Sequence, residues 1–193
     1  KQVTHQGIPM VIARMGYSRE LCYELFLQDG SKGNDLWELL WEAGQEFKIS
    51  AGGPNIILRL EGGILSYLAD IDRSNNPYEV GLDWLVDLEQ EDDFIGKEAL
   101  RLVSQNGPTK KLMGAEIHGD PIEDSNADHW PVFINGKKVG SMNAMVYSPR
   151  LDKNICYTIL DIEHAKSGQE IVIAAPEKDL MATTIDLPWR ERA

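Results

Sequence analysis

The stretch GYSRELCYELFL, residues 16–27, predicts a polar turn that leads into a β-strand at 21–28, and this strand helps to build an open sheet. Apolar side chains alternate along it, as in a strand with one face on a core. One face carries Leu21, Tyr23, Leu25 and Leu27. Leu21, Tyr23 and Leu25 are expected to reach the helix at 33–47 and to be buried within the chain. The other face places Glu24 between Cys22 and Phe26, where a carboxylate is costly unless a partner binds it. Glu24 is therefore a candidate functional residue.

The neighbouring segments complete a strand–strand–helix unit. IPMVIARM, residues 8–15, predicts a second strand, and GNDLWELLWEAGQEF, residues 33–47, has the apolar spacing of a helix. Such a unit is typical of an open sheet with helices on one face. Beyond it we expect a short helix within 52–63, a strand at 82–88 and a helix at 94–107.

After Pro108 the pattern changes to closely spaced short strands. Asn135–Gly136 between two apolar runs is a strong signal for a two-residue hairpin. Strands without intervening helices are typical of a small antiparallel barrel. We therefore predict an α+β fold, with a partial α/β body over 1–107 and an antiparallel β-barrel over 108–193.

Charge and composition argue against several classes of partner and site. The formal net charge of −12 disfavours nucleic acid and anionic membrane surfaces, and no run of about 18 apolar residues predicts a membrane span. The four histidines lack the spacing of metal ligands, so we expect no metal site. Cys22 and Cys156 are expected to be buried free thiols in a reducing compartment, which favours a cytoplasmic protein.

Five strings in order along the chain resemble the tetrahydrofolate-dependent glycine cleavage T-protein family, which includes aminomethyltransferases and demethylases. The family reads roughly GYTGEDGFEI, LRLEAGLPLYGHDID, PxExGLxW, DFIGREAL and SPxLxKNIA. This chain matches the first string around Tyr17 and Glu24. It continues with LRLEGGILSYLADID at 58–72, PYEVGLDW at 77–84, DFIGKEAL at 93–100 and SPRLDKNI at 148–155.

The resemblance covers the C-terminal half of the family. It implies that residues 1–107 belong to the folate-binding body and that 108–193 form the C-terminal barrel. The family's catalytic aspartate lies in the other half, so no catalytic residue is assigned here. We expect the chain to be inactive alone and to expose apolar surface that the missing N-terminal half, or a second copy in a homodimer, would cover.

For Glu24, the resemblance implies recognition of the folate pterin. A carboxylate can accept two parallel hydrogen bonds from the pterin ring N–H and amino group, with Cys22 and Phe26 as an apolar floor. The alternative is a strand carboxylate that faces water or pairs with Arg14 or Arg59.

Three further positions match family motifs as cofactor-binding candidates. Tyr17 and Tyr67 would line the cavity for tetrahydrofolate or substrate. The alternative is that both are core tyrosines. Glu61 matches the glutamate of RLEAG, and the alternative is an ion pair with Arg59 or a neighbour.

Departures from the aminomethyltransferase pattern favour the demethylase branch, which includes the dimethylsulfoniopropionate demethylase. Asn55 and Ile56 stand where the aminomethyltransferases have Arg-Asp, so a cofactor-binding arginine is lost. The resemblance then implies transfer of a methyl group from a small-molecule donor to tetrahydrofolate. Two alternatives stay open. One is the glycine cleavage aminomethyltransferase, with an aminomethyl donor and a lipoylated partner, and the other is a folate-binding or interaction module without turnover.

Overall fold

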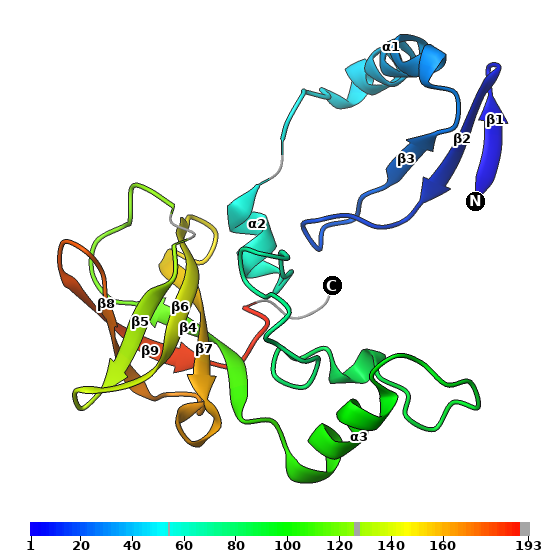
Figure 1. The fold of residues 1–193 in the computed structure, drawn as a ribbon. Coiled ribbons are helices and arrows are strands. Elements are labelled where there is room, and N and C mark those ends of the chain that lie inside the picture. Colours follow the sequence, from blue (N-terminus) through cyan, green and yellow to red (C-terminus); the bar gives the residue numbers. More distant parts are fainter. Residues whose placement is uncertain (54, 126–127, 190–193) are drawn as a thin grey trace. The chain divides into compact units, whose positions relative to one another are not determined.

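The computed structural model describes residues 1–53, 55–125 and 128–189. The contacts divide the chain into two compact units, Lys1–Asn55 and Ile56–Ala193. Figure 1 shows the elements of both units. No helix in the described part of the chain is long and apolar enough to cross a membrane.

The first unit is a three-stranded antiparallel sheet with one longer helix. The strands β1 (Gln2–His5), β2 (Ile8–Ala13) and β3 (Glu24–Leu27) lie in the order β1-β2-β3. They are followed by η1 (Gly30–Lys32), α1 (Gly33–Gly44) and η2 (Gln45–Phe47). The core of the unit consists of Ile8, Met10 and Leu36, with Val3, Ile12, Leu25, Leu27 and Leu39 packed against them.

The strand expected at 21–28 is shorter than predicted. It begins only at Glu24, which pairs with Ala13 of β2. Arg19 lies in the turn expected before this strand and has a left-handed φ of 56°. The prediction that Leu21 and Tyr23 are buried is therefore wrong: their exposed fractions are 72% and 60%.

The second unit contains a closed six-stranded antiparallel barrel, which confirms the predicted fold class. Its strands are β4 (Lys110–Ile117), β5 (Trp130–Ile134), β6 (Lys137–Ser148), β7 (Lys153–Asp161), β8 (Glu170–Ala174) and β9 (Asp179–Ile185). They run around the barrel as β4-β7-β6-β5-β8-β9, and β9 pairs with β4 to close it. Asn135 and Gly136 join β5 to β6, both with positive φ as a type I′ turn requires.

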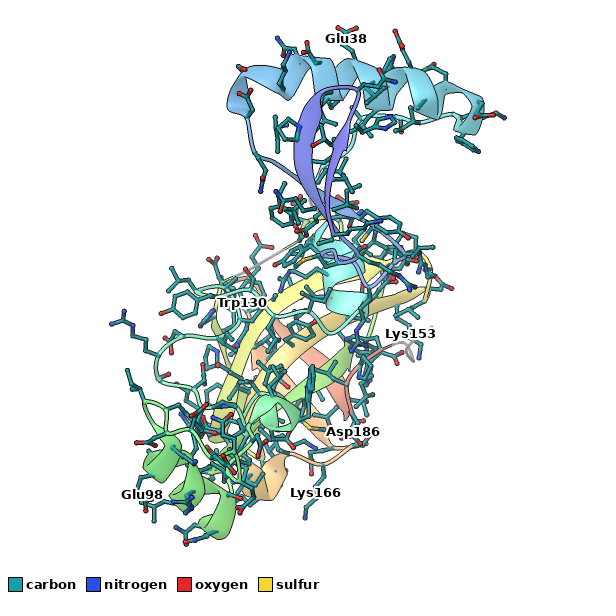
Figure 2. All side chains as sticks on the ribbon, turned by 90° about the vertical axis from the view of Figure 1, so that its right-hand side faces the viewer. Glu38, Glu98, Trp130, Lys153, Lys166 and Asp186 are labelled. Atoms are coloured by element: carbon teal, nitrogen blue, oxygen red, sulfur yellow. The ribbon has the colours of Figure 1, made fainter. Side chains whose placement is uncertain are left out.

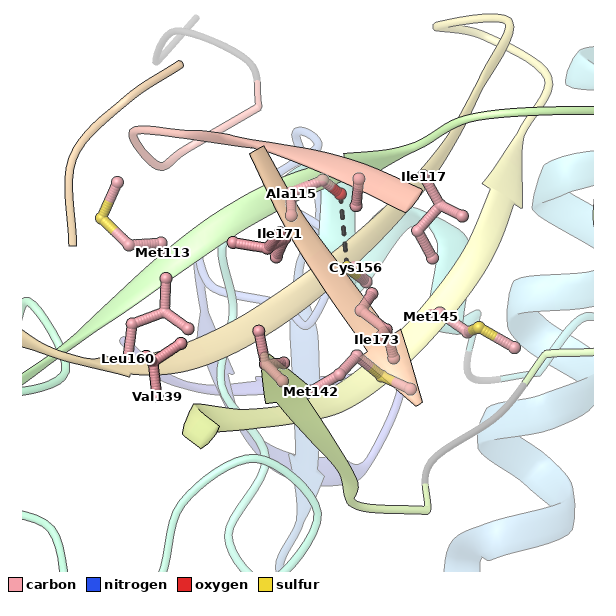
Figure 3. Packing of buried hydrophobic residues seen from close by; sticks show 12 residues of the cluster. Met113, Ala115, Ile117, Val139, Met142, Met145, Cys156, Leu160, Ile171 and Ile173 are labelled. Carbon is pink, nitrogen blue, oxygen red and sulfur yellow. Dashed lines mark hydrogen bonds between the residues drawn. The ribbon is translucent and has the colours of Figure 1, made fainter. Parts of the chain in front are cut away.

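The barrel interior is filled with apolar side chains and leaves Cys156 deeply buried. Met113, Met142, Leu160 and Ile173 are among the fully buried members of this cluster. Figure 3 shows Cys156 among them, with its thiol donating to the backbone oxygen of Ala115 at 3.3 Å. This interior is a packed core, so candidate sites lie outside it.

Shorter elements surround the barrel. They are α2 (Ile56–Glu61), η3 (Asp83–Leu85), α3 (Lys97–Asn106) and η4 (Ile162–His164). Leu60 of α2 packs with Ile155 and Tyr157 on the outer side of β7. The helix α3 confirms the expected helix, but the strand expected at 82–88 is wrong, because a 3-10 turn occupies it. The domain boundary between residues 107 and 108 stays a prediction.

Candidate functional site

The helix α2 carries a buried carboxylate that is bound by the barrel. Glu61 is 1% exposed, and its Oε1 accepts a hydrogen bond of 2.6 Å from the hydroxyl of Ser148 on β6. Its Oε2 lies 3.7 Å from the Arg150 guanidinium. The structure thus gives Glu61 an ion pair, the alternative to a cofactor role, and its partner is Arg150 rather than Arg59. A cofactor-binding role for Glu61 stays a prediction.

A second polar cluster fixes the segment after α2. The guanidinium of Arg59 forms a buried salt bridge with Asp70 and donates to the backbone oxygen of Ile64 at 3.2 Å. The same Asp70 carboxylate accepts from the Ser66 amide at 2.6 Å, and Asn143 of β6 donates to the Asp70 backbone oxygen at 2.6 Å. These bonds hold residues 62–72 in one conformation. The ion-pair partner that the structure gives Arg59 is Asp70.

The fixed segment presents Tyr67 and Leu68 to solvent. Their exposed fractions are 57% and 74%. Tyr67 forms an isolated bridge with Ile71, and the Leu68 amide donates to the Ile71 backbone oxygen at 2.8 Å. His129 Nε2 lies 2.9 Å from the Ala69 backbone oxygen. Tyr67 is therefore no core tyrosine, and its ring is accessible to a ligand.

A pocket of about 130 Å³ lies beside Leu68 on the barrel wall. Its apolar side chains come from Leu68, Ile71 and Ile159, and its polar lining includes Asp70, Asp72, Ser74, Asn75, Lys110, His129, Ser141 and Asn143. Hydrogen bonds from the side chain and backbone amide of Ser74 lower the pKa of Asp72. The pocket therefore combines an apolar wall with an ionised carboxylate.

In the first unit, Glu24 lies on the open face of the sheet. Leu25 and Leu27 pack in the core with Leu36 of α1, so alternation turns Glu24 and Phe26 to the opposite face. Glu24 is half-buried, and Phe26 is 49% exposed. The face thus offers a carboxylate acceptor next to an accessible aromatic ring.

The loop before β3 supplies the other candidates of this unit. Tyr17 is 45% exposed, so it is not a core tyrosine either. Cys22 is half-buried rather than buried, and its thiol donates to the Met15 backbone oxygen at 3.4 Å. Both lie in the segment between β2 and β3, which leads directly into Glu24.

The sequence did not point to the Arg59–Asp70 pair or to Asn143. All three are buried polar residues, and Asn143 lies 73 positions after Asp70 in the sequence. The sequence feature that could have indicated a buried ion pair is the two aspartates of LADID, which lie next to an apolar run. Among the described residues, no group of three or more His, Cys, Asp or Glu side chains could hold a metal ion.

Comparison with known families gives two matches along the chain. Residues 1–90 match the model of the GCVT N-terminal domain, and residues 110–189 match that of the glycine cleavage T-protein C-terminal barrel domain.

Curated relatives of two kinds align over nearly the whole chain. The dimethylsulfoniopropionate demethylase DmdA of Ruegeria pomeroyi is 32% identical over 192 residues, covering 98% of this chain and 51% of the relative. An aminomethyltransferase of Symbiobacterium thermophilum is 34% identical over 197 residues, covering 98% of this chain and 50% of the relative. The chain thus spans about half the length of these relatives.

A solved structure shares the fold. The glycine cleavage system aminomethyltransferase T from Bartonella henselae superposes with a TM-score of 0.82 at 22% identity. The superposition covers 97% of this chain and 51% of that protein.

Proposed function

The chain belongs to the glycine cleavage T-protein family, and from this premise we propose that it is the folate-binding part of an enzyme that transfers a methyl group to tetrahydrofolate. The single observation that carries the proposal is the placement of Glu24. It is a half-buried carboxylate on the open sheet face, beside the exposed ring of Phe26.

The residues of the first unit fit a flat, hydrogen-bonding ring. A carboxylate can accept two parallel N–H donors, and an aromatic side chain can stack on a ring face. Glu24 would bind the donor edge of the pterin, and Phe26 and Tyr17 would contact its faces. In the second unit, the match to the family motifs makes Tyr67 and Glu61 further candidates for contact with the cofactor or substrate.

Bound tetrahydrofolate would supply the N5 nucleophile that accepts the one-carbon group. The contribution of this chain is to position the cofactor and to exclude water from the reacting atoms. No residue of the chain is assigned to acid–base chemistry.

Methyl transfer is favoured over aminomethyl transfer by the residues at 55 and 56. Asn55 and Ile56 remove the arginine that the family pattern of aminomethyltransferases places there, and DmdA is among the relatives. The aminomethyltransferase of Symbiobacterium thermophilum supports the alternative, in which the donor is an aminomethyl group. Incubating the enzyme with tetrahydrofolate and each class of donor distinguishes them by the folate product, 5-methyl or 5,10-methylene.

Turnover requires a complementary N-terminal half, because the chain spans about half of its relatives. The edge strands β1 and β3 of the three-stranded sheet are suitable for pairing with further strands. We place this assembly in the cytoplasm, in keeping with the free thiols of Cys22 and Cys156. Without the complementary half, the chain would act as a folate-binding module.

The test is the binding of 5-formyltetrahydrofolate to the chain by isothermal titration calorimetry. Glu24→Gln should weaken binding by about 1–3 kcal/mol, because one acceptor is replaced by a donor that faces a donor. Glu38→Gln is the matched control, since Glu38 lies exposed on α1 (Figure 2). Equal affinities of the Glu24 variant and the parent would refute the assignment, and no binding by the parent would refute the function.

A further inference from the structure

Leu68 adopts a backbone conformation that leucine disfavours. Its φ is 72°, in the left-handed region, where the β-carbon of an L-residue crowds the backbone. The family string LYGHDID has glycine at this position, whereas the chain reads SYLADID. Glycine would meet the same geometry without strain.

The strain at Leu68 is not offset by burial of its side chain, which is 74% exposed. It persists because the surrounding bonds fix the backbone. The Leu68 amide is bound to Ile71, the Ala69 oxygen to His129, and the Asp70 oxygen to Asn143. A strained residue that its surroundings hold in place is typical of functional sites.

The Leu68 side chain has a position from which it can contact a ligand. It follows the exposed Tyr67 directly, and with Ile71 and Ile159 it supplies the apolar lining of the pocket beside the barrel. The polar lining includes Asp72, Ser74 and Asn75. An apolar wall beside polar groups suits a flat heteroaromatic ring, which has apolar faces and a hydrogen-bonding edge.

We propose that Leu68 is a ligand-contact residue, and that this strained, exposed leucine and Tyr67 together form an apolar rim against a ring face of tetrahydrofolate. This inference rests on the proposed function and adds to it a residue that no family motif assigns. Glycine at this position should therefore leave the fold at least as stable and impair binding.

The experiment measures two quantities on the full chain: affinity for 5-formyltetrahydrofolate by calorimetry and the midpoint of thermal unfolding, Tm. Leu68→Gly and Leu68→Ala should both bind about tenfold more weakly, because the apolar contact is lost. Leu68→Gly should have a Tm equal to or above that of the parent, since glycine relieves the strain. Leu68→Ala keeps the strain and should not gain stability.

Lys48→Gly is the matched control. Lys48 is exposed and has a φ of 57°, so glycine relieves the same kind of strain in the first unit, at a residue that takes no part in the rim. It should bind like the parent. If Leu68→Gly also binds like the parent, the inference is overturned and the proposed function stands. If the parent does not bind, both are overturned.

Discussion

Glu61 and Ser148 show how single residues join distant parts of the chain. They are 87 positions apart, yet the Ser148 hydroxyl donates to the buried Glu61 carboxylate at 2.6 Å. The same hydroxyl accepts from the Leu151 amide at 3.1 Å. Neither residue type suggests such a pairing in sequence, because glutamates and serines are mostly exposed. The motif match singled out Glu61, but only the fold supplies its partner.

Removal of the Ser148 hydroxyl should destabilise the second unit. Ser148→Ala leaves the buried Glu61 carboxylate with one donor fewer, and we expect a loss of about 1–3 kcal/mol in the free energy of unfolding. Urea unfolding followed by tryptophan fluorescence measures it. Ser104→Ala, at an exposed position on α3, is the control. Equal stability of both variants would contradict a structural role for this bond.

The buried thiol of Cys156 should make the barrel less stable at alkaline pH. Burial raises the pKa of its thiol well above the ordinary value. In the unfolded chain the thiol loses its proton near pH 8.5, whereas in the folded chain it stays protonated. The stabilising difference is fully present below pH 8.5 and is lost as the pH rises above it, by up to about 1.4 kcal/mol per pH unit.

Urea unfolding at pH 7 and pH 10 tests this prediction. The parent should lose more stability between the two pH values than Cys156→Ala, in which this thiol is absent. Cys22→Ala is the control and should behave like the parent, since Cys22 is only half-buried. The same loss in the parent and the Cys156 variant would show that the thiol can ionise within the fold.

At the scale of elements, periodicity predicted α1, α3 and the barrel strands but not the length of β3. Alternation at Leu21 and Tyr23 is typical of a strand, yet β3 begins only at Glu24 and both side chains are exposed. The helical stripe also continued beyond the core: Leu36 is buried, whereas Phe47 is 77% exposed. Local pattern indicates which face could be buried, and tertiary packing decides whether it is.

The loop of residues 62–72 should depend on the Arg59–Asp70 pair. Asp70→Asn would leave the buried guanidinium of Arg59 without its counter-charge, and we expect the free energy of unfolding to fall by about 3–5 kcal/mol. Lys137→Ala breaks the exposed Lys137–Glu163 pair and should lower the free energy of unfolding by less than about 1 kcal/mol. Chemical denaturation compares the two variants. A similar small loss in both would mean that the buried pair does not anchor the loop.

At the scale of the whole molecule, the chain resembles its relatives over half of their length and exposes aromatic surface in its first unit. Trp37 and Trp41 stack on α1 with ring centroids 6.1 Å apart, and Leu40 beside them is 41% exposed. Helical spacing places these tryptophans beside the apolar stripe and predicts that they pack within the unit, which is wrong, since both remain accessible. That outcome depends on which other elements the sheet and helix meet.

We predict that the isolated chain self-associates through this surface, because contiguous exposed apolar side chains favour contact with a second copy when the complementary half is absent. Light scattering after size-exclusion chromatography should give a mass that rises with concentration. Trp37→Glu combined with Trp41→Glu should return the monomer mass, because a charge would be buried in any contact. Leu102→Glu, at a 52%-exposed position on α3, should leave the association unchanged. A parent chain that is monomeric at every concentration would indicate that the tryptophan surface is stable in water. The case for a complementary half would then rest on the length of the relatives alone.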